Sequence, residues 1–453
     1  MGRLFGTDGV RGVANTELTV ELALSLGRAV VLTLREEGRG RTSAGGRRRP
    51  HLVIGRDPRA SGEMLEAALV AGITSAGGDV TTVGCLPTPG VAYLTVALEA
   101  DSGAMISASH NPVADNGIKF FGPDGYKLTD AEEERVAALV DGGDPDRPTG
   151  IHIGRSASGS HLLERYADHL VAAADADLGR LRVVVDCANG AASSVAPEVL
   201  RRLGCDLTVI NAAPDGTNIN ERCGSNHPDA VAAAVIEHGA DVGLAHDGDA
   251  DRLVAVDHRG EVVDGDAILA ILARELHAEH GLNAVVTTVM TNLGFVQAMH
   301  ELGIEVVQTQ VGDRYVLEAM RQGGHPLGGE QSGHLIFADV ATTGDGVLSA
   351  VRLLSTLARS GRSLAELATV MCRLPQVLVN VADIDRTRLA GADALWKSVA
   401  KEEKALGGNG RVLVRASGTE PLVRIMVEAD NEPHAREVAQ RLATVATEEL
   451  GSR

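Results

Sequence analysis

The spacing of apolar positions predicts alternating helices and strands over residues 19–140. Thr19 is a typical helix cap, and it precedes apolar residues at near-helical spacing: Leu22, Leu26, Ala29, Val30 and Leu34. Short apolar runs predict strands at 52–54, 80–83 and 104–107. Thr129 and Glu132 have the spacing of a capping box, so we expect another helix to begin there.

Two further blocks repeat this pattern of strand, loop and helix. A Gly/Pro/Asp-rich stretch at 141–148 is typical of a linker, and a helix expected at 162–173 opens the second block. Strands of the second block are expected at 183–185, 207–210, 242–245 and 253–256. The third block has apolar runs at 284–289 and 304–307, with helices expected at 267–277, 316–322 and 346–358.

The last part of the chain, from Gln376 onward, has a different pattern. Apolar residues alternate at 377–381 and 423–427, and a further strand is expected at 411–414. This pattern predicts a smaller α+β unit whose antiparallel sheet is exposed on one face. Arg424 would then project away from the apolar side of that sheet. The chain as a whole predicts four domains, at 1–158, 159–258, 259–374 and 375–453.

Charge and hydropathy exclude two kinds of partner. The 453 residues carry 42 Lys and Arg against 61 Asp and Glu, a net charge of −19, so we expect no nucleic-acid partner. The longest uncharged stretch, 80–98, contains Pro and Gly and cannot form a continuous lipid-facing helix, so we expect no membrane span.

Cysteine usage bears on the compartment. There are five cysteines, an odd number without any C-x-x-C spacing, which argues against a disulfide framework and against a thiolate zinc site. The first residues lack the apolar stretch of a secretory signal. We therefore expect a cytoplasmic protein.

An arginine-rich stretch interrupts the first block. Residues 38–50 carry five arginines, and no aromatic residue lies among them. A nucleic-acid patch would interleave the two kinds of side chain. We therefore expect a solvated loop insertion.

Three aspartates follow the strand expected at 242–245. Asp247, Asp249 and Asp251 are spaced so that an extended loop would direct all three carboxylates to one side. Two like charges ~4 Å apart repel by ~4 kcal/mol at an effective dielectric constant of ~20, so the cluster needs full solvation or a cation. The loop is no EF-hand, because Arg252 and His258 stand where that motif needs Gly and Glu. An acidic turn and a Mg²⁺ site both fit this loop alone.

A second polar loop, Ile106-Ser107-Ala108-Ser109-His110-Asn111-Pro112, follows another expected strand. Such loops at the carboxyl ends of strands bind ligands in open α/β sheets. A Ser–His hydrolase is disfavoured, since adjacent residues do not normally face each other and no G-x-S-x-G occurs. A plain Ser/Asn-Pro turn fits as well. Lys119, further along, is either an acid/base group or a solvated surface charge.

Two more loops carry polar groups suited to a phosphorylated sugar. Arg415, Ser417, Gly418, Thr419 and Arg424 offer hydroxyl, amide and guanidinium donors to a dianion, although a hairpin turn has the same composition. A carboxylate, an amide, a hydroxyl and an imidazole, which together are suited to binding vicinal sugar hydroxyls, occur in the segment Gly328-Gly329-Glu330-Gln331-Ser332-Gly333-His334. No Walker motif and no G-x-G-x-x-G occurs, so nothing supports a nucleotide fold.

Taken in order, these loops closely resemble those of the α-D-phosphohexomutase superfamily, and within it of the bacterial phosphoglucosamine mutases. The resemblance begins at Phe5-Gly6-Thr7-Asp8-Gly9-Val10-Arg11-Gly12 and continues through the Ser109, three-aspartate, Glu330 and Arg415 loops. Two segments look like the glucosamine branch: Asn218-Ile219-Asn220-x-x-Cys223-Gly224-Ser225-x-His227-Pro228, and the loop with Gln331, where other branches usually carry Met. The resemblance implies an α/β protein of three similar domains with mixed sheets, and a C-terminal α+β domain like the TATA-box-binding protein, around a central cleft. The arginine-rich insertion is longer than we expect for the family.

The resemblance also implies roles for individual residues. Ser109 would carry a phosphoryl group as phosphoserine, and it would hold one Mg²⁺ per subunit together with Asp247, Asp249 and Asp251. Catalytic residues would be Ser109, His110, Lys119, Arg11, Arg252 and His334, with Lys119 and His334 as acid/base candidates. Substrate-binding residues would be Glu330, Ser332, Arg415, Ser417, Gly418, Thr419 and Arg424.

The activity so implied is the interconversion of glucosamine 6-phosphate and glucosamine 1-phosphate through a 1,6-bisphosphate, which also serves as activator. The product would feed UDP-N-acetylglucosamine and cell-wall precursor synthesis. The expected partner is a small hexosamine phosphate, and a homodimer is expected from the family. The alternatives are a phosphomannomutase/phosphoglucomutase, a non-catalytic sugar-phosphate sensor and a metal-dependent phosphatase.

Overall fold

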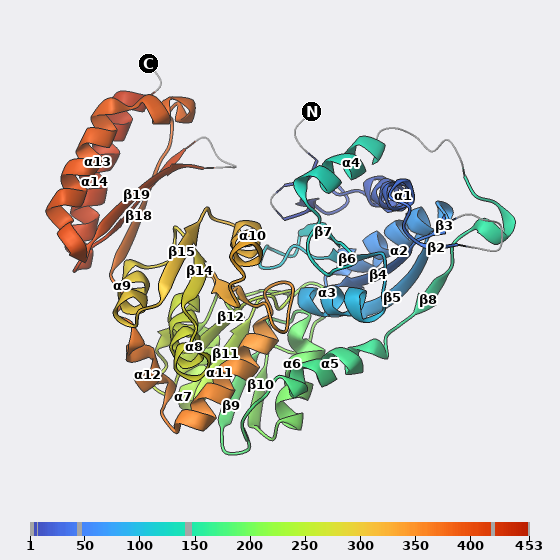
Figure 1. The fold of residues 1–453 in the computed structure, drawn as a ribbon, viewed down its shortest axis with the longest axis horizontal. Coiled ribbons are helices and arrows are strands. Elements are labelled where there is room, and N and C mark those ends of the chain that lie inside the picture. The colour runs from blue at the N-terminus through green and yellow to red at the C-terminus, as the bar shows by residue number, and fades with distance from the viewer. Residues whose placement is uncertain (1–3, 7, 43–47, 141–146, 418–421, 452–453) are drawn as a thin grey trace. The chain divides into compact units, whose positions relative to one another are not determined.

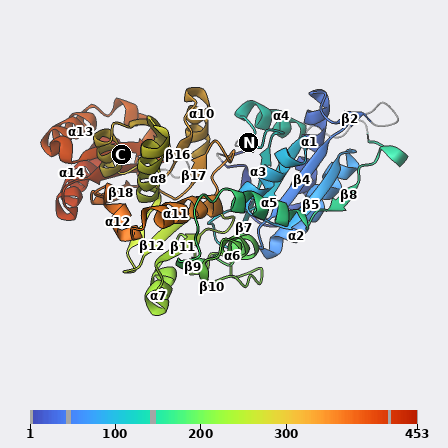
Figure 2. The same cartoon turned by 60° about the horizontal axis from the view of Figure 1, so that its bottom comes forward.

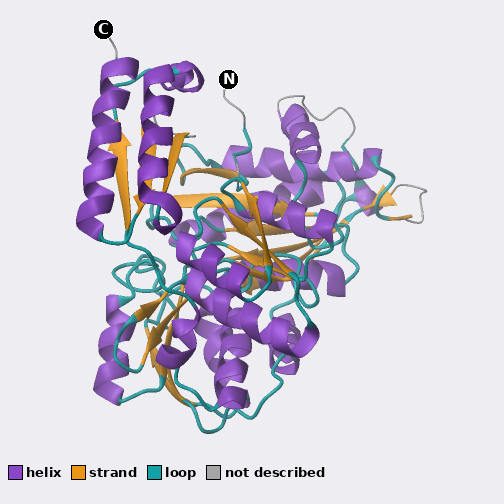
Figure 3. Cartoon of the chain, turned by 60° about the vertical axis from the view of Figure 1, so that its left-hand side comes forward, coloured by secondary structure: helices purple, strands orange, loops and turns teal. Residues whose placement is uncertain are grey.

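The computed structural model describes residues 4–6, 8–42, 48–140, 147–417 and 422–451. Contacts divide the chain into two compact units. The first contains Met1–Val289 and Ile304–Thr369, and the second contains Met290–Gly303 and Val370–Arg453. In the first unit, helices pack against the sheets (Figure 3). The central strands are buried along most of their length, which accounts for their near-continuous apolar runs.

The first sheet of unit 1 carries Ser109 at the end of a central strand. Its strand order is β1 (Val10–Val13), β7 (Asp115–Phe121), β6 (Ser102–Ile106), β4 (His51–Arg56), β5 (Asp79–Cys85) and β8 (Ser156–Ser158). Strands β6, β4, β5 and β8 run parallel, while β7 is antiparallel to both β6 and β1. Its helices are α1 (Val20–Glu36), α2 (Ala60–Ser75), α3 (Thr88–Ala97) and α4 (Asp130–Val140).

Local signals account for the ends of these helices. The Thr19 hydroxyl accepts from the Leu22 amide and so caps α1 as predicted. The amide of Thr129 donates to the Glu132 carboxylate and that of Glu132 to the Thr129 hydroxyl, so the predicted capping box is present. Helices α1, α2 and α4 share one apolar core with β4 and β6, and α3 also packs on β4 and β6 (Figure 1).

The arginine-rich insertion is more ordered than the solvated loop we expected. Strands β2 (Arg41–Thr42) and β3 (Arg48–Arg49) form a short antiparallel ribbon, with residues 43–47 lying outside the described part. The ribbon is anchored because Asp101 accepts the Gly40 and His51 amides at its two ends. Most of the predicted linker, 141–146, also lies outside the described residues.

The second sheet carries the three aspartates. Its order is β10 (Asp206–Ile210), β9 (Arg182–Asp186), β11 (Val242–His246), β12 (Leu253–Asp257) and β13 (Val262–Val263), and Figure 2 shows the first four side by side. Strands β10, β9 and β11 are parallel, whereas β12 returns antiparallel to β11. The turn between β11 and β12 is the three-aspartate loop. The accompanying helices are α5 (Leu162–Ala172), α6 (Ala192–Arg202) and α7 (Asp229–His238), and η1 (Gly150–His152) precedes β8.

The third sheet carries the Glu330 loop between two antiparallel strands. Its order is β15 (Glu305–Thr309), β14 (Ala284–Thr288), β16 (Leu327–Gly329) and β17 (Leu335–Phe337). Strands β14, β15 and β16 are parallel, and β17 is antiparallel to β16. Its helical elements are α8 (Gly265–His280), α10 (Asp313–Gly323), α11 (Gly346–Ser360) and α12 (Leu364–Leu367), and η2 (Ala368–Val370) lies at the change of unit.

Unit 2 is the predicted smaller α+β unit. Its antiparallel sheet has the order β18 (Gln376–Val381), β20 (Val423–Glu428), β19 (Arg411–Ala416). One face packs on α13 (Asp393–Leu406) and α14 (Glu432–Leu450), which the strand pattern did not predict. The unit also contains η3 (Arg386–Gly391), η4 (Gly407–Asn409) and α9 (Leu293–Glu301), whose first amide donates to Glu428. The three α/β sheets and the C-terminal α+β unit agree with the expected fold class, while the exact domain boundaries and the central cleft stay predictions.

Candidate active site

Ser109 lies in the loop after β6, with only 1% of its surface exposed. Its hydroxyl donates to Asp247 Oδ2 at 2.5 Å, and the Ser109 oxygen also lies 3.2 Å from His110 Nδ1. We expected these neighbouring side chains to face apart, and that expectation is wrong. Ser109 has a left-handed backbone, with φ of 51°, which turns the chain sharply at this residue.

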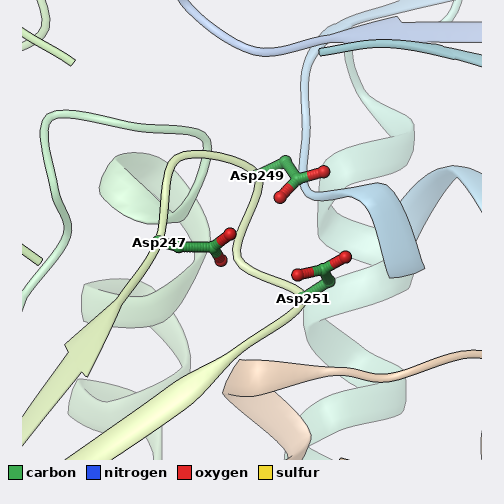
Figure 4. Close-up of side chains that lie close together, drawn as sticks. All are labelled: Asp247, Asp249 and Asp251. Carbon is green, nitrogen blue, oxygen red and sulfur yellow. The ribbon is translucent and has the colours of Figure 1, made fainter. Parts of the chain in front are cut away.

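The three aspartates converge in the turn between β11 and β12. Figure 4 shows Asp247, Asp249 and Asp251 around one point, and a ligand oxygen from each lies within 4.8 Å of the others. The convergence was predicted, but the reason given for it was wrong. The loop is a tight turn with Ala250 left-handed at φ of 57°, rather than an extended segment. A Cβ on Gly248 would lie 2.5 Å from the Ser109 carbonyl oxygen, so glycine lets the two loops approach.

The trio has the electrostatics of a cation site. Burial, together with the charges of Asp251 and Asp249, raises the pKa of Asp247 far above its ordinary value. Burial alone would also raise the pKa of Asp249, but the ammonium of Lys119 at 3.2 Å, the hydrogen bond from the Thr88 hydroxyl and the charge of Arg11 together lower it. One oxygen of Asp249 and one of Asp251 are buried without a hydrogen-bond partner. These residues fit a metal ion, because a cation would satisfy the free oxygens and offset the repulsion.

Lys119 is buried in β7, so its interpretation as a solvated surface charge is wrong. Its ammonium lies 3.2 Å from a carboxylate oxygen of Asp249 and 3.2 Å from one of Asp8. Burial would lower the pKa of this lysine, but the two carboxylates outweigh burial and raise it. Lys119 is therefore charged in this arrangement.

The ion pairs continue beyond Lys119 and return to the trio. Lys127 lies 2.6 Å from Asp8 and 2.5 Å from Asp313, a residue of the first turn of α10. His334 completes the ring, since its Nε2 lies 3.7 Å from Asp313 and its Nδ1 lies 3.5 Å from Asp251. We did not predict Lys127 and Asp313 as site residues. No local spacing marks either one, because Lys127 and its partners Asp8 and Asp313 lie far apart along the chain.

The remaining predicted catalytic residues lie around the same point. The backbone amide of Arg252 donates to Asp247, and its guanidinium Nε lies 3.7 Å from Asp251. Arg11 forms an ion pair with Asp8. Burial, followed by the positive charges of Arg252 and Arg11, lowers the pKa of His110 to about 4. His110 is thus neutral at pH 7 and can accept a hydrogen bond from a hydroxyl group.

The Glu330 loop joins β16 and β17. The carboxylate of Glu330 accepts from the Gly312 amide, and burial raises the pKa of this carboxyl. Gln331 Nε2 and Ser332 Oγ are buried without a hydrogen-bond partner, so both atoms can form hydrogen bonds with ligand hydroxyls. Burial would lower the pKa of His334, but the charges of Asp251, Asp313 and Glu330 raise it. When the imidazole is neutral, Nε2 accepts from the Gly344 amide, so the remaining proton lies on Nδ1, toward Asp251.

The fourth predicted loop belongs to unit 2 and is described in part. Arg415 and Arg424 are directly opposite each other on β19 and β20. Burial and the positive charge of Arg424 lower the pKa of Arg415, which indicates a place where an anion would be stabilised. Ser417 is buried, and its carbonyl accepts from Arg386. Gly418 and Thr419 lie outside the described residues.

Comparison with known proteins identifies the family. Residues 2–147, 164–260 and 264–373 match the alpha/beta/alpha domains I, II and III of phosphoglucomutase/phosphomannomutase, and residues 377–445 match its C-terminal domain. The chain belongs to the phosphoglucomutase/phosphomannomutase family. As a member of that family it is an enzyme of the isomerase class that transfers a phosphoryl group within its substrate.

Curated relatives within this family cover the whole chain. Phosphoglucosamine mutase from Streptomyces coelicolor is 56% identical over 457 aligned residues, covering 100% of both chains. Phosphoglucosamine mutase from Thermobifida fusca is 56% identical over 452 residues, covering 99% of each.

Solved structures of the family share the fold. A phosphoglucomutase/phosphomannomutase family protein from Burkholderia thailandensis is 26% identical, with a TM-score of 0.82 over 98% of this chain and 97% of that one. An N-acetylphosphoglucosamine mutase from Aspergillus fumigatus, in complex with GlcNAc-6P and magnesium, is 18% identical, with a TM-score of 0.61 over 94% and 99%. Within the described residues, no helix has the length and apolarity needed to cross a membrane.

The ring of ion pairs makes Lys127 important for stability. In Lys127→Met, the carboxylates of Asp8 and Asp313 lose their shared cation, and we expect a loss of about 1–3 kcal/mol at pH 7. This is less than for a fully buried pair, because their side chains keep 26% and 19% exposure. The charges on Lys119, Lys127 and Arg11 lower the pKa of Asp8, and Lys127 lowers that of Asp313, in each case despite burial. The contribution is therefore fully present above the ordinary carboxyl pKa and is lost as the pH falls from there through the lowered pKa of the folded protein.

Thermal unfolding of Lys127→Met and wild type, at pH 7 and near pH 4, measures this difference. The exposed Lys397 of α13 provides the matched control, Lys397→Met, whose melting temperature should not change. Equal stability of Lys127→Met and wild type at pH 7 would contradict the role assigned to Lys127.

Proposed function

We propose that the protein is a phosphoglucosamine mutase, which interconverts glucosamine 6-phosphate and glucosamine 1-phosphate through phosphoserine at Ser109. The observation that carries this proposal is the buried Ser109 hydroxyl, 2.5 Å from a carboxylate of a trio that fits a cation. The choice of glucosamine rests on full-length relatives of that name at 54–56% identity. Gln331 and the segment at 218–228 support the same branch.

Asp247, Asp249 and Asp251, with the phosphate on Ser109, would hold Mg²⁺ through oxygen ligands alone. When bound, Mg²⁺ neutralises charge and polarises the P–O bonds of the phosphoserine. The residues of the chain then supply positioning and proton movement, which is most of what phosphoryl transfer needs from a protein.

In the first half-reaction, the bond between Ser109 Oγ and phosphorus breaks while the sugar 1-hydroxyl oxygen bonds to phosphorus. The hydroxyl proton leaves the sugar, and Ser109 Oγ takes up a proton. Lys119 and His334 are the groups we assign to these transfers, because both lie against the trio. After the 1,6-bisphosphate turns end over end, the 6-phosphate returns to Ser109 by the reverse steps.

Other residues would bind the substrate. Glu330 and Ser332 would contact sugar hydroxyls, and Arg11, Arg252 and His110 would line the transfer site. Arg415, Ser417, Gly418, Thr419 and Arg424 would hold the phosphate that is not being transferred. The five unpaired cysteines support a reducing, cytoplasmic location, where the product would enter UDP-N-acetylglucosamine and cell-wall precursor synthesis. A homodimer stays a prediction.

Replacing the phosphate carrier should abolish turnover. Ser109→Ala removes the only oxygen through which this mechanism can pass the phosphoryl group, so we expect kcat to fall by more than ~10⁴-fold with the fold retained. Steady-state kinetics measures the loss, and mass spectrometry should find one phosphate on wild-type Ser109 and none on the variant. The control is Ser160→Ala, at an exposed serine of the same unit. A near-normal rate in Ser109→Ala would exclude this serine as carrier.

Substrate preference distinguishes the proposal from its nearest alternative. We expect kcat/KM for glucosamine 6-phosphate to exceed those for glucose and mannose 6-phosphates by at least ~100-fold, since a site built for one polar group rejects analogues that leave it unpaired. A preference for glucose 6-phosphate would point instead to a phosphoglucomutase. Release of free phosphate without isomer formation would point to a phosphatase.

Activity should also depend on a divalent ion bound by the trio. We expect the EDTA-treated protein to be inactive and Mg²⁺ to restore the rate. Asp251→Asn should weaken Mg²⁺ binding by ~10-fold to ~100-fold, because it removes one of three anionic ligands. Calorimetric titration with Mg²⁺ measures the affinity, and Asp206→Asn, at an exposed aspartate of the same sheet, is the matched control. Full activity after EDTA treatment would contradict the metal assignment.

A further inference from the structure

Arg59 has a completely buried side chain, although it carries a charge and belongs to none of the four motif loops. It lies between β4 and α2 and forms an ion pair with Asp57, which is also fully buried, at 2.9 Å from Nε to Oδ2. Burial of a charge is unfavourable unless the group is paired and hydrogen-bonded. The remaining N–H groups of the guanidinium must therefore also have hydrogen-bond acceptors.

Each terminal nitrogen of Arg59 donates to two backbone carbonyls in the segment from Ser109 to Asp115, where β7 begins. Nη2 lies 2.9 Å from the Ser109 oxygen and 2.8 Å from the Asn111 oxygen. Nη1 lies 2.5 Å from the Pro112 oxygen and 3.1 Å from the Asp115 oxygen. With Nε on Asp57, all five N–H groups of the guanidinium have acceptors. One side chain therefore holds four carbonyls of residues 109–115.

Asn220, which follows a strand of the second sheet, donates to two of the same carbonyls. Its side-chain amide nitrogen Nδ2 lies 2.9 Å from the Ser109 carbonyl oxygen and 3.2 Å from the Asn111 carbonyl oxygen. Asn220 lies between β10 and α7, and its own backbone is left-handed at φ of 58°. The carbonyls of Ser109 and Asn111 thus have donors from both the first and the second sheet of unit 1.

A third connection reaches the amide of Ser109. Asp57 Oδ2, which accepts from Arg59, also accepts from the Ser107 hydroxyl at 2.6 Å. The Ser107 oxygen in turn accepts from the Ser109 amide at 2.9 Å. Both the amide and the carbonyl of Ser109 are therefore held while its backbone is left-handed, a conformation that serine rarely adopts without support.

We propose that Arg59 and Asn220 are positioning residues for phosphoryl transfer, which hold the carbonyls of residues 109–115 so that Ser109 Oγ faces the three aspartates. They touch neither the substrate nor the transferred group. Their effect on the rate comes through the placement of Ser109, where a displacement of ~1 Å can reduce the rate ~10²-fold. This inference rests on the proposed function for its kinetic consequence, but its structural part concerns the loop alone.

Two variants separate this role from simple stabilisation. Arg59→Lys keeps the charge beside Asp57 but loses the planar fork that spans four carbonyls. Asn220→Gly removes the amide and suits the left-handed backbone. The matched control is Asn15→Gly, since Asn15 is an exposed asparagine that is also left-handed, at φ of 62°.

The first measurement is hydrogen exchange of amides in residues 107–118, on protein whose melting temperature shows that it is folded. We expect exchange at least ~10-fold faster in Arg59→Lys and Asn220→Gly, and wild-type exchange in Asn15→Gly. This readout does not depend on activity, so it tests the inference even if the proposed function fails. Wild-type exchange in both folded variants would overturn it. If Arg59→Lys does not fold, Asn220→Gly decides alone.

The second measurement is steady-state kinetics, normalised to the fraction of Ser109 that carries phosphate. We expect kcat to fall ~100-fold in Arg59→Lys and ~10-fold in Asn220→Gly, with KM within ~3-fold of wild type because the substrate contacts are untouched. Wild-type kcat in a folded Arg59→Lys protein would overturn the inference and leave the proposed function standing. Absence of turnover in the wild type would instead refute the proposed function.

Discussion

The site depends on the repulsion among three buried carboxylates held within 4.8 Å of one another. Burial removes the water that would otherwise screen these charges, and the pKa of Asp247 rises far above its ordinary value as a result. A phosphate of about −1.5 to −2 on Ser109 would increase the repulsion further. Lys119 and Arg252 offset part of this repulsion, and the trio fits a cation that would offset more of it.

The same constraint connects the three sheets of unit 1. Asp249 belongs to the second sheet, its partner Lys119 to the first, and Asp313 to the first turn of α10, which packs on the third. The ring of alternating charges therefore closes only when all three α/β blocks are folded and in place. Stability of the unit and geometry of the site consequently share the same ion pairs, so a change in Lys127 affects both.

Local pattern predicted the parts of this protein that depend on local interactions. The caps at Thr19 and Thr129, most strands of the first three sheets and the loops with the polar groups agree with the structure. Strand β7 was not predicted, because it begins with Asp, Asn and Gly and carries a Lys between its apolar residues. Contacts such as Lys127 with Asp313 join residues 186 apart along the chain, and no spacing rule finds them. A pattern of apolar positions also cannot predict the left-handed backbone of Ser109, at which the His110 ring comes close to the Ser109 hydroxyl.

The buried pair of Arg59 and Asp57 follows from the backbone that Ser109 requires. For stability alone, an apolar pair of similar volume would serve as well as a buried ion pair. However, residues 107–114 lie outside the ladders of β6 and β7 where the chain turns toward the aspartates, and a carbonyl without a ladder partner needs another donor where water is excluded. A guanidinium supplies four such donors from one direction while its fifth contacts Asp57, and no other side chain has that geometry. The irregular loop that places Ser109 against the three aspartates is therefore the reason for a buried charge in the first domain.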